Sequence, residues 1–259
     1  MSFANVQVEK VENIGVLTLD HPPANALNQP TFSGIADALE ALERDTEVKV
    51  VLIKGNGRFF AAGADIKEFT TIQTAEEAAI LAKRGQQVFD RIEQFSKPVI
   101  AAIHGAALGG GLELAMACHI RFATPEAKVG LPELNLGLIP GFAGTQRLPR
   151  IVGKAKALEL LFSGQPINGE EAQKLGLVNQ CFAEEELFEK ALQYAKLVAS
   201  KSAVTLSAVL GVVAHGEKHG FDEGAAYEAE WFGKVFATAD AKEGIQAFIE
   251  KRKPNFKDQ

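Results

Sequence analysis

The chain has 259 residues, of which 47% are hydrophobic and 23% are charged, and its formal net charge is −6 at pH 7. This composition is typical of a globular protein with a buried core, and it excludes disordered and fibrous classes. The basic residues are scattered along the chain, which argues against a nucleic-acid-binding face.

The sequence predicts no disulfide framework, metal site or membrane insertion. Its two cysteines, Cys118 and Cys181, are too few for a disulfide framework or a four-ligand zinc site, so we expect reduced, buried thiols. Apolar runs such as 99–103 are far shorter than the roughly 20 residues that cross a bilayer. Because the amino terminus lacks the apolar core of a secretory signal, we expect a cytoplasmic protein.

Strand-like and helical patterns alternate through the first half of the chain. Runs of β-branched residues predict strands, and apolar residues at helical spacing predict helices. In chain order we expect strands at 6–11, 14–19, 48–53 and 99–103, and helices at 32–42, 74–95 and 112–118. This alternation predicts an α/β fold.

The last third of the chain is predicted to be almost entirely helical. Asp240 and Glu243 form a plausible N-terminal capping pair for the last helix, whose apolar stripe needs a cover. Either the protein's own core or a subunit interface would provide it. We expect one strand at 178–182 and helices at 154–162, 169–175, 184–200, 204–214, 221–236 and 240–251.

Two glutamates stand among apolar neighbours in the segment 97–148. Glu113 stands two residues after a glycine triplet and lies in the apolar run 112–118, and Glu133 lies between Pro132 and Leu134. A carboxylate that faced the core would carry a desolvation cost of several kcal/mol unless it were paired or used. From the pattern alone, each glutamate could equally face solvent on an amphipathic element.

Two loops of small residues are candidate ligand sites. Residues 61–64 follow a strand-like run, and Gly110 is expected at the N-terminus of a helix. Such turns expose backbone N–H donors, and two convergent donors would form an oxyanion hole. Each loop taken singly could also be a tight turn without a ligand.

The histidines and the common motifs offer no stronger site. The chain has no P-loop, no dinucleotide-binding glycine motif and no G-x-S-x-G motif. His215 and His219 are four residues apart, but no third metal ligand is identifiable, so a solvated helix face is favoured. We expect His104 and His119 to be satisfied histidines of the core.

Four segments together carry a family resemblance: AAGADIKEF, KPVIAAIHGAALGGGLELAMACHIRFA, GLPELNLGLIPGFAGTQRLPRIVG and FIEKRKPNF. In this order they resemble the enoyl-CoA hydratase/isomerase (crotonase) family over essentially the whole chain. The resemblance implies a spiral of ββα units in residues 1–200 and a C-terminal helical region, 201–259, that assembles homotrimers or hexamers. It implies an acyl-CoA thioester as substrate and no cofactor beyond the CoA that the substrate carries.

The resemblance also implies the roles of individual residues. The backbone N–H groups of Ala64 and Gly110 would bind the thioester oxygen, Glu113 would be the base on water, and Glu133 would protonate the α-carbon. The amide of Gly141 would help to hold the water. The implied CoA contacts are Ala24, Ala62, Asp65, Ile66, Lys67 and, from a neighbouring subunit, Lys251.

The chain departs from the family pattern at two places. The segment 69–97 belongs to a variable region, so acyl-chain length is not implied. Phe142 puts a bulky ring where many members have a small residue, and it would either narrow the pocket or pack beneath it. The presence of both glutamates favours a hydratase, as in fatty-acid β-oxidation, over a double-bond isomerase of the same fold. An RNA-binding relative, the other alternative, would need a basic surface interleaved with aromatic residues, which the sequence does not show.

Overall fold

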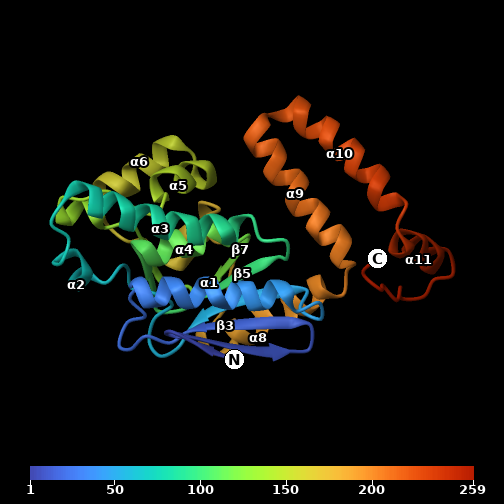
Figure 1. The fold of residues 1–259 in the computed structure, drawn as a ribbon, viewed down its shortest axis with the longest axis horizontal. Coiled ribbons are helices and arrows are strands. Elements are labelled where there is room, and N and C mark those ends of the chain that lie inside the picture. The colour runs from blue at the N-terminus through green and yellow to red at the C-terminus, as the bar shows by residue number, and fades with distance from the viewer.

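The computed structural model describes residues 1–259, which form a main sheet of seven strands in the order β1-β2-β3-β4-β5-β7-β9 (Figure 1). Strands β1 to β3 are antiparallel, and β3 through β9 pair in parallel. A second sheet pairs β6 with β8 in parallel. The strands are β1 (Ser2–Phe3), β2 (Val6–Val11), β3 (Ile14–Leu19), β4 (Val50–Gly55), β5 (Val99–Ile103), β6 (Ala106–Leu108), β7 (Ile120–Ala123), β8 (Lys128–Gly130) and β9 (Gln180–Cys181).

Helices cover both faces of the main sheet. Apolar residues of α1, α3 and α4 share one buried cluster with one face of the sheet, and apolar residues of α8 share another with the opposite face. Central strands are therefore buried on both sides, as in other parallel sheets. The helices are α1 (Gln29–Arg44), α2 (Ile66–Phe69), α3 (Ala75–Glu93), α4 (Gly110–Ala117), the 3₁₀ helix η1 (Glu133–Leu136), α5 (Gly144–Val152), α6 (Lys154–Ser163), α7 (Gly169–Lys174), α8 (Glu184–Ala199), α9 (Ala203–His219), α10 (Phe221–Phe236) and α11 (Ala239–Ile249).

Most predicted elements are confirmed, within a few residues at their ends. The strands at 6–11, 14–19 and 99–103 match β2, β3 and β5, and 221–236 matches α10. The structure adds short elements that the sequence patterns did not indicate, among them α2, β6, β8 and η1. These elements have three or four residues each, too few to show a period.

The predicted capping pair at α11 is wrong. Thr238 caps this helix by accepting a hydrogen bond from the amide of Ala241. Asp240 instead accepts bonds from the backbone amides of Lys257 and Asp258 in the chain's final residues. Asp240 is therefore used to hold the C-terminal segment against α11 and not to start the helix.

The helices α9 and α10 form a hairpin that projects from the rest of the molecule, with α11 at its base (Figure 1). Large apolar side chains lie exposed on these helices, with Phe221 87% and Phe248 85% accessible. Further exposed members are Val209, Val213, Phe232, Phe236, Ile245 and Ile249. No single helix is both long and apolar enough to cross a membrane. The helices α8 and α9 reach that length and apolar character only when they are taken together, and a bend of 101° separates them.

A cluster of three phenylalanines joins α1, α3 and the segment before α5. The ring centroids of Phe32, Phe89 and Phe142 lie 5.1 to 5.7 Å from one another. Such aromatic groups pack by edge-to-face contact as well as by burial of apolar area. The cluster thus ties the segment before α5 to the core.

We expect Phe89→Ala to destabilise the protein by about 3–5 kcal/mol, because Phe89 is fully buried and its loss leaves a cavity. Phe162→Ala is the matched control, since Phe162 is 71% exposed and its truncation should change stability by less than about 0.5 kcal/mol. Denaturant unfolding measures both. Equal stability of Phe89→Ala and the parent protein would contradict the role given to the cluster.

Candidate active site

Glu113 is a carboxylate in the protein core. It belongs to the first turn of α4 and is only 1% exposed. The helix begins at the turn of Gly109, whose φ of 49° lies in the left-handed region that glycine tolerates. Of the two positions that the sequence pattern left open for Glu113, the structure shows the buried one and excludes a solvated glutamate.

One oxygen of Glu113 is held by two backbone amides from the segment before α5. The amides of Phe142 and Gly144 donate to Oε1 at 2.8 and 2.7 Å. Ala143, between them, has a φ of 72°, which turns both amides towards the same oxygen. A Cβ at Gly144 would lie 2.8 Å from Oε1, so the carboxylate needs glycine there.

Glu133 brings a second carboxylate to the Gly109 turn, where α4 begins. It begins η1, and its Oε1 would lie 2.8 Å from a Cβ at Gly109, the residue before α4. Its Oε2 is buried and has no hydrogen-bond partner within the protein. An ionised oxygen in that position would be costly, so this geometry favours the protonated acid.

Burial raises the pKa of both glutamates. The pKa of Glu113 rises to about 7 because desolvation and the nearby Glu133 outweigh the opposing effects of the Gly144 and Phe142 amides and of Arg147. The pKa of Glu133 is also raised by desolvation. Two interacting carboxyl groups whose pKa values are both raised are suited to exchange protons with a substrate.

The two loops of small residues, 61–64 and the turn at Gly109 and Gly110, lie side by side. Residues 61–64 run alongside β6, where the Leu108 amide donates to the carbonyl of Ala61. The Cα of Gly63 would lie 3.8 Å from a Cβ at Gly109. The bridge between Leu27 and Ala64 uses the Gly63 carbonyl and the Asp65 amide, and so leaves the Ala64 amide free of it. Gly110 is the first residue of α4, so its amide has no acceptor within the helix.

The predicted CoA contacts fall into two groups. Ala24 and Ala62 are joined by a backbone hydrogen bond of 3.0 Å, and Asp65, which caps α2, lies at the end of the same loop. Ile66 and Lys67 follow as exposed residues. Lys251 is exposed and stands two residues after α11, a helix that lies on the opposite side of the molecule from α2 (Figure 1).

Around the Gly141–Gly144 segment, the structure decides between the two alternatives for Phe142 and adds two contacts, of Gln86 and Arg147, that were not predicted from the sequence. Phe142 packs beneath the site: its ring lies against α3, where a Cβ at Gly85 would lie 2.3 Å away, and against Gly110. Gln86 donates to the carbonyl of Gly141 at 2.8 Å. Arg147, 4% exposed, donates to the carbonyl of Phe142 at 2.9 Å. The only sequence signal for Arg147 was its position in the motif GTQRL.

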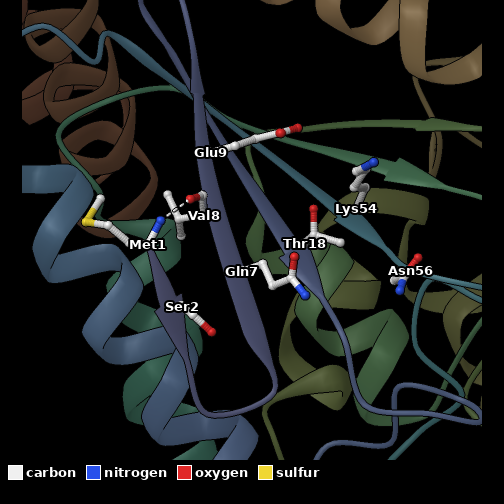
Figure 2. A pocket seen from close by; sticks show the side chains of 8 residues that line it. All are labelled: Met1, Ser2, Gln7, Val8, Glu9, Thr18, Lys54 and Asn56. Carbon is white, nitrogen blue, oxygen red and sulfur yellow. Dashed lines mark hydrogen bonds between the residues drawn. The ribbon is translucent and has the colours of Figure 1, made fainter.

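The other candidates remain outside this site. A polar hollow across β1, β2, β3 and β4 is lined by eight residues, none of which is a predicted site residue (Figure 2). His215 stacks on Tyr227 within the α9–α10 hairpin, and its ring centroid lies 4.3 Å from that of His219. Cys118 is buried and Cys181 half-buried, and both are free thiols.

Comparison with known proteins agrees with this geometry. The model of the family described as "Enoyl-CoA hydratase/isomerase" matches residues 9–259. A probable enoyl-CoA hydratase of Bacillus subtilis is 56% identical over 94% of this chain and 95% of its own length. The crotonyl-CoA hydratase of Syntrophomonas wolfei is 45% identical over 99% of both chains. The chain therefore belongs to the enoyl-CoA hydratase/isomerase family.

Solved structures confirm the predicted crotonase-like fold. An enoyl-CoA hydratase from Geobacillus kaustophilus superposes with a TM-score of 0.96 at 32% identity, over 100% of this chain and 98% of that one. An enoyl-CoA hydratase from Bacillus anthracis gives a TM-score of 0.94 at 34% identity, over 98% of this chain and all of its own.

The raised pKa of Glu113 predicts a pH-dependent stability difference for Glu113→Gln. A carboxyl group whose pKa is raised on folding stabilises the protein most below its unfolded pKa of 4.5 and loses that contribution as pH rises to about 7. Glutamine keeps an oxygen for both amides but does not ionise. Relative to the parent protein, the variant should therefore gain about 2–3 kcal/mol between pH 4.5 and 7.5.

Denaturant unfolding across this pH range tests the prediction. Glu126→Gln is the control, because Glu126 is exposed and should show no such gain. A difference that stays constant with pH would mean that Glu113 is not held at a raised pKa.

Proposed function

We propose that Glu113 and Glu133 carry out the reaction of this enoyl-CoA hydratase, the addition of water across the double bond of a trans-2-enoyl-CoA to give the 3-hydroxyacyl-CoA. One observation carries the proposal: two carboxyl groups with different hydrogen-bond environments, those of the buried Glu113 and the half-buried Glu133, flank the Gly109 turn. Glu113 accepts two amides, which favour its ionised form, whereas Glu133 has an unpartnered buried oxygen. This asymmetry supplies a base and an acid for one water.

The atoms of the reaction balance between these two groups. Glu113 takes a proton from the water, and the water oxygen forms a bond to the β-carbon. The electrons of the double bond move towards the thioester, and Glu133 gives its proton to the α-carbon. The proton on Glu113 then passes to Glu133, which restores both groups for the next turnover.

The negative charge of the intermediate would be taken up by the Ala64 and Gly110 amides. Their loops are adjacent, neither amide is used by the bridge or helix that borders it, and Gly110 adds the positive end of the α4 dipole. One well-aimed donor of this kind is typically worth about 3–4 kcal/mol in the transition state. No cofactor beyond the CoA of the substrate enters these steps.

Gly141 is the proposed third contact of the water. Its carbonyl is held by the side chain of Gln86, which fixes the orientation of the adjacent peptide groups. Ala24, Ala62, Asp65, Ile66 and Lys67 are proposed to border the CoA arm, since they form one continuous strip beside Ala64. A cytoplasmic site of action remains a prediction from the sequence.

An isomerase would share the two amides but would need a single base to move one proton. The second carboxyl group, Glu133, therefore favours hydration, as do the hydratases among the relatives. A nucleic-acid-binding role would need a basic surface, which a net charge of −6 with scattered basic residues does not favour.

We further propose that residues 201–259 form the subunit interface of a trimer, alone or paired as a hexamer. The exposed apolar side chains of α9, α10 and α11 support this, because a surface patch of this kind normally meets a partner. A neighbouring subunit would also bring Lys251 to the CoA, because in its own chain this residue follows α11, which lies far from α2 (Figure 1).

The first test is the ultraviolet absorbance of crotonyl-CoA, which falls when hydration removes the conjugated double bond. Glu113→Gln and Glu133→Gln should each lower kcat by about 10²–10⁴-fold, because each removes one proton-transfer group. Glu126→Gln should keep the parent rate, since Glu126 is exposed on another segment. Full activity in either of the first two variants would refute the proposed roles.

The assembly is tested by Phe248→Glu, which places a charge on the exposed apolar face of α11. Sedimentation should show smaller species than the parent trimer or hexamer, because a buried unpaired charge opposes association. Gln193→Glu, an equal charge change at an exposed position of α8, should leave the assembly intact. A parent protein that sediments as a monomer would contradict the proposal.

A further inference from the structure

Arg147 is a buried cation for which the proposed reaction has no use. It lies on α5, is 4% exposed, and its guanidinium donates hydrogen bonds in three directions. Its Nη2 reaches Asp90 Oδ1 at 2.7 Å and Glu93 Oε2 at 2.8 Å, and its Nε reaches the same Glu93 oxygen at 3.1 Å. Its Nη1 donates to the carbonyl of Phe142 at 2.9 Å. A fixed fork of this kind is specific to arginine.

The Phe142 carbonyl belongs to the segment that holds Glu113. The peptide group that Arg147 grips joins Phe142 to Ala143, and it lies between the two amides that donate to Glu113 Oε1. Ala143 adopts a φ of 72°, a left-handed conformation that residues with a Cβ disfavour. Such a conformation persists only where neighbouring contacts hold it.

We propose that Arg147 is a positioning residue of the hydratase. It ties the Phe142–Gly144 segment to α3, keeps the amides of that segment hydrogen-bonded to Glu113 Oε1, and places a positive charge near the Glu113 carboxyl group. The inference rests on the role proposed for Glu113 as the base. It adds a residue that touches neither substrate nor water.

The charged groups around Glu113 define the sign of this effect. Glu133, from η1, raises the pKa of Glu113, and Arg147, from α5, lowers it. Asp90 and Glu93, from α3, meet Arg147 and partly offset its charge. The strand β6 (Ala106–Leu108), which also packs against α4, carries no charged residue.

Substitution of Arg147 should therefore change the pH profile as well as the rate. Arg147→Met removes the cation and the grip on Phe142, so kcat for crotonyl-CoA should fall about 10- to 100-fold with a much smaller change in KM. The acid limb of kcat/KM should move up by roughly one pH unit, because a lost positive charge raises the pKa of a neighbouring carboxyl group.

Two further variants separate geometry from charge. Arg147→Lys keeps the positive charge but loses the forked hydrogen bonds of the guanidinium group. The acid limb of its kcat/KM profile should therefore match that of the parent protein, while its kcat falls. Glu93→Gln leaves Arg147 in place and removes a negative charge beside it, so the acid limb should move down, opposite to Arg147→Met. Arg150→Met, at an exposed position of the same helix, is the control and should match the parent in rate and profile.

Opposite shifts in Arg147→Met and Glu93→Gln would establish the proposal. It is overturned if both keep the parent's acid limb, or if Arg147→Met keeps the parent kcat. If Arg147→Met fails to fold, as judged by thermal unfolding, Glu93→Gln and Arg147→Lys decide: an unshifted limb in the first or an unchanged kcat in the second overturns it. Activity retained in Glu113→Gln would instead refute the proposed function, which is a separate result.

Discussion

The structure around the site depends on one constraint, the burial of the Glu113 carboxylate in the core. A carboxylate removed from water costs several kcal/mol unless donors replace the lost solvent. Here the donors are two backbone amides, and they converge only because the segment before α5 turns through Ala143 in the left-handed region. The phenylalanine cluster and Arg147 hold that segment in place. The burial of the Glu113 carboxylate on α4 therefore requires a defined packing of α3, α4 and α5.

The placement of the two free amides follows from the second, smaller sheet. The pairing of Ala61 with Ala107 carries the loop after β4 alongside β6, and α4 begins two residues after β6 ends. Both amides therefore come from backbone that is fixed by hydrogen bonds on its other side. Donors that are held in advance need no rearrangement when charge develops, which is why such sites stabilise an enolate so effectively.

The sequence predicted the alternating βα pattern and most elements, and it singled out Glu113 and Glu133, whose carboxyl groups lie near enough to interact. The long elements were accessible because their hydrophobic periods are local properties of the chain. The contact of Phe142 with Gly85, the hydrogen bond from Gln86 and the buried position of Arg147 were not accessible. Each joins residues more than 50 positions apart, and no local pattern specifies such a partner. For Asp240 the sequence indicated a local contact that the structure does not form. The predicted capping role at α11 is replaced by a contact with the C-terminal segment, whose Lys257 amide donates to Asp240.

The two carboxyl groups differ in how firmly the fold holds them. Glu113 is fixed by a helix, two amides and the surrounding core, whereas Glu133 stands on the four-residue η1, which is held near Gly164 by a hydrogen bond of 3.3 Å from Asn135. Removing the Glu133 carboxyl group would strand no partner of its Oε2, because that oxygen has none in the protein. Under the proposed mechanism, the donors that stabilise the charge of the intermediate lie on backbone that is fixed in the core, whereas the group that protonates the α-carbon lies on one short surface element. The proposed mechanism thus separates the donors that an isomerase would share from the residue that favours hydration.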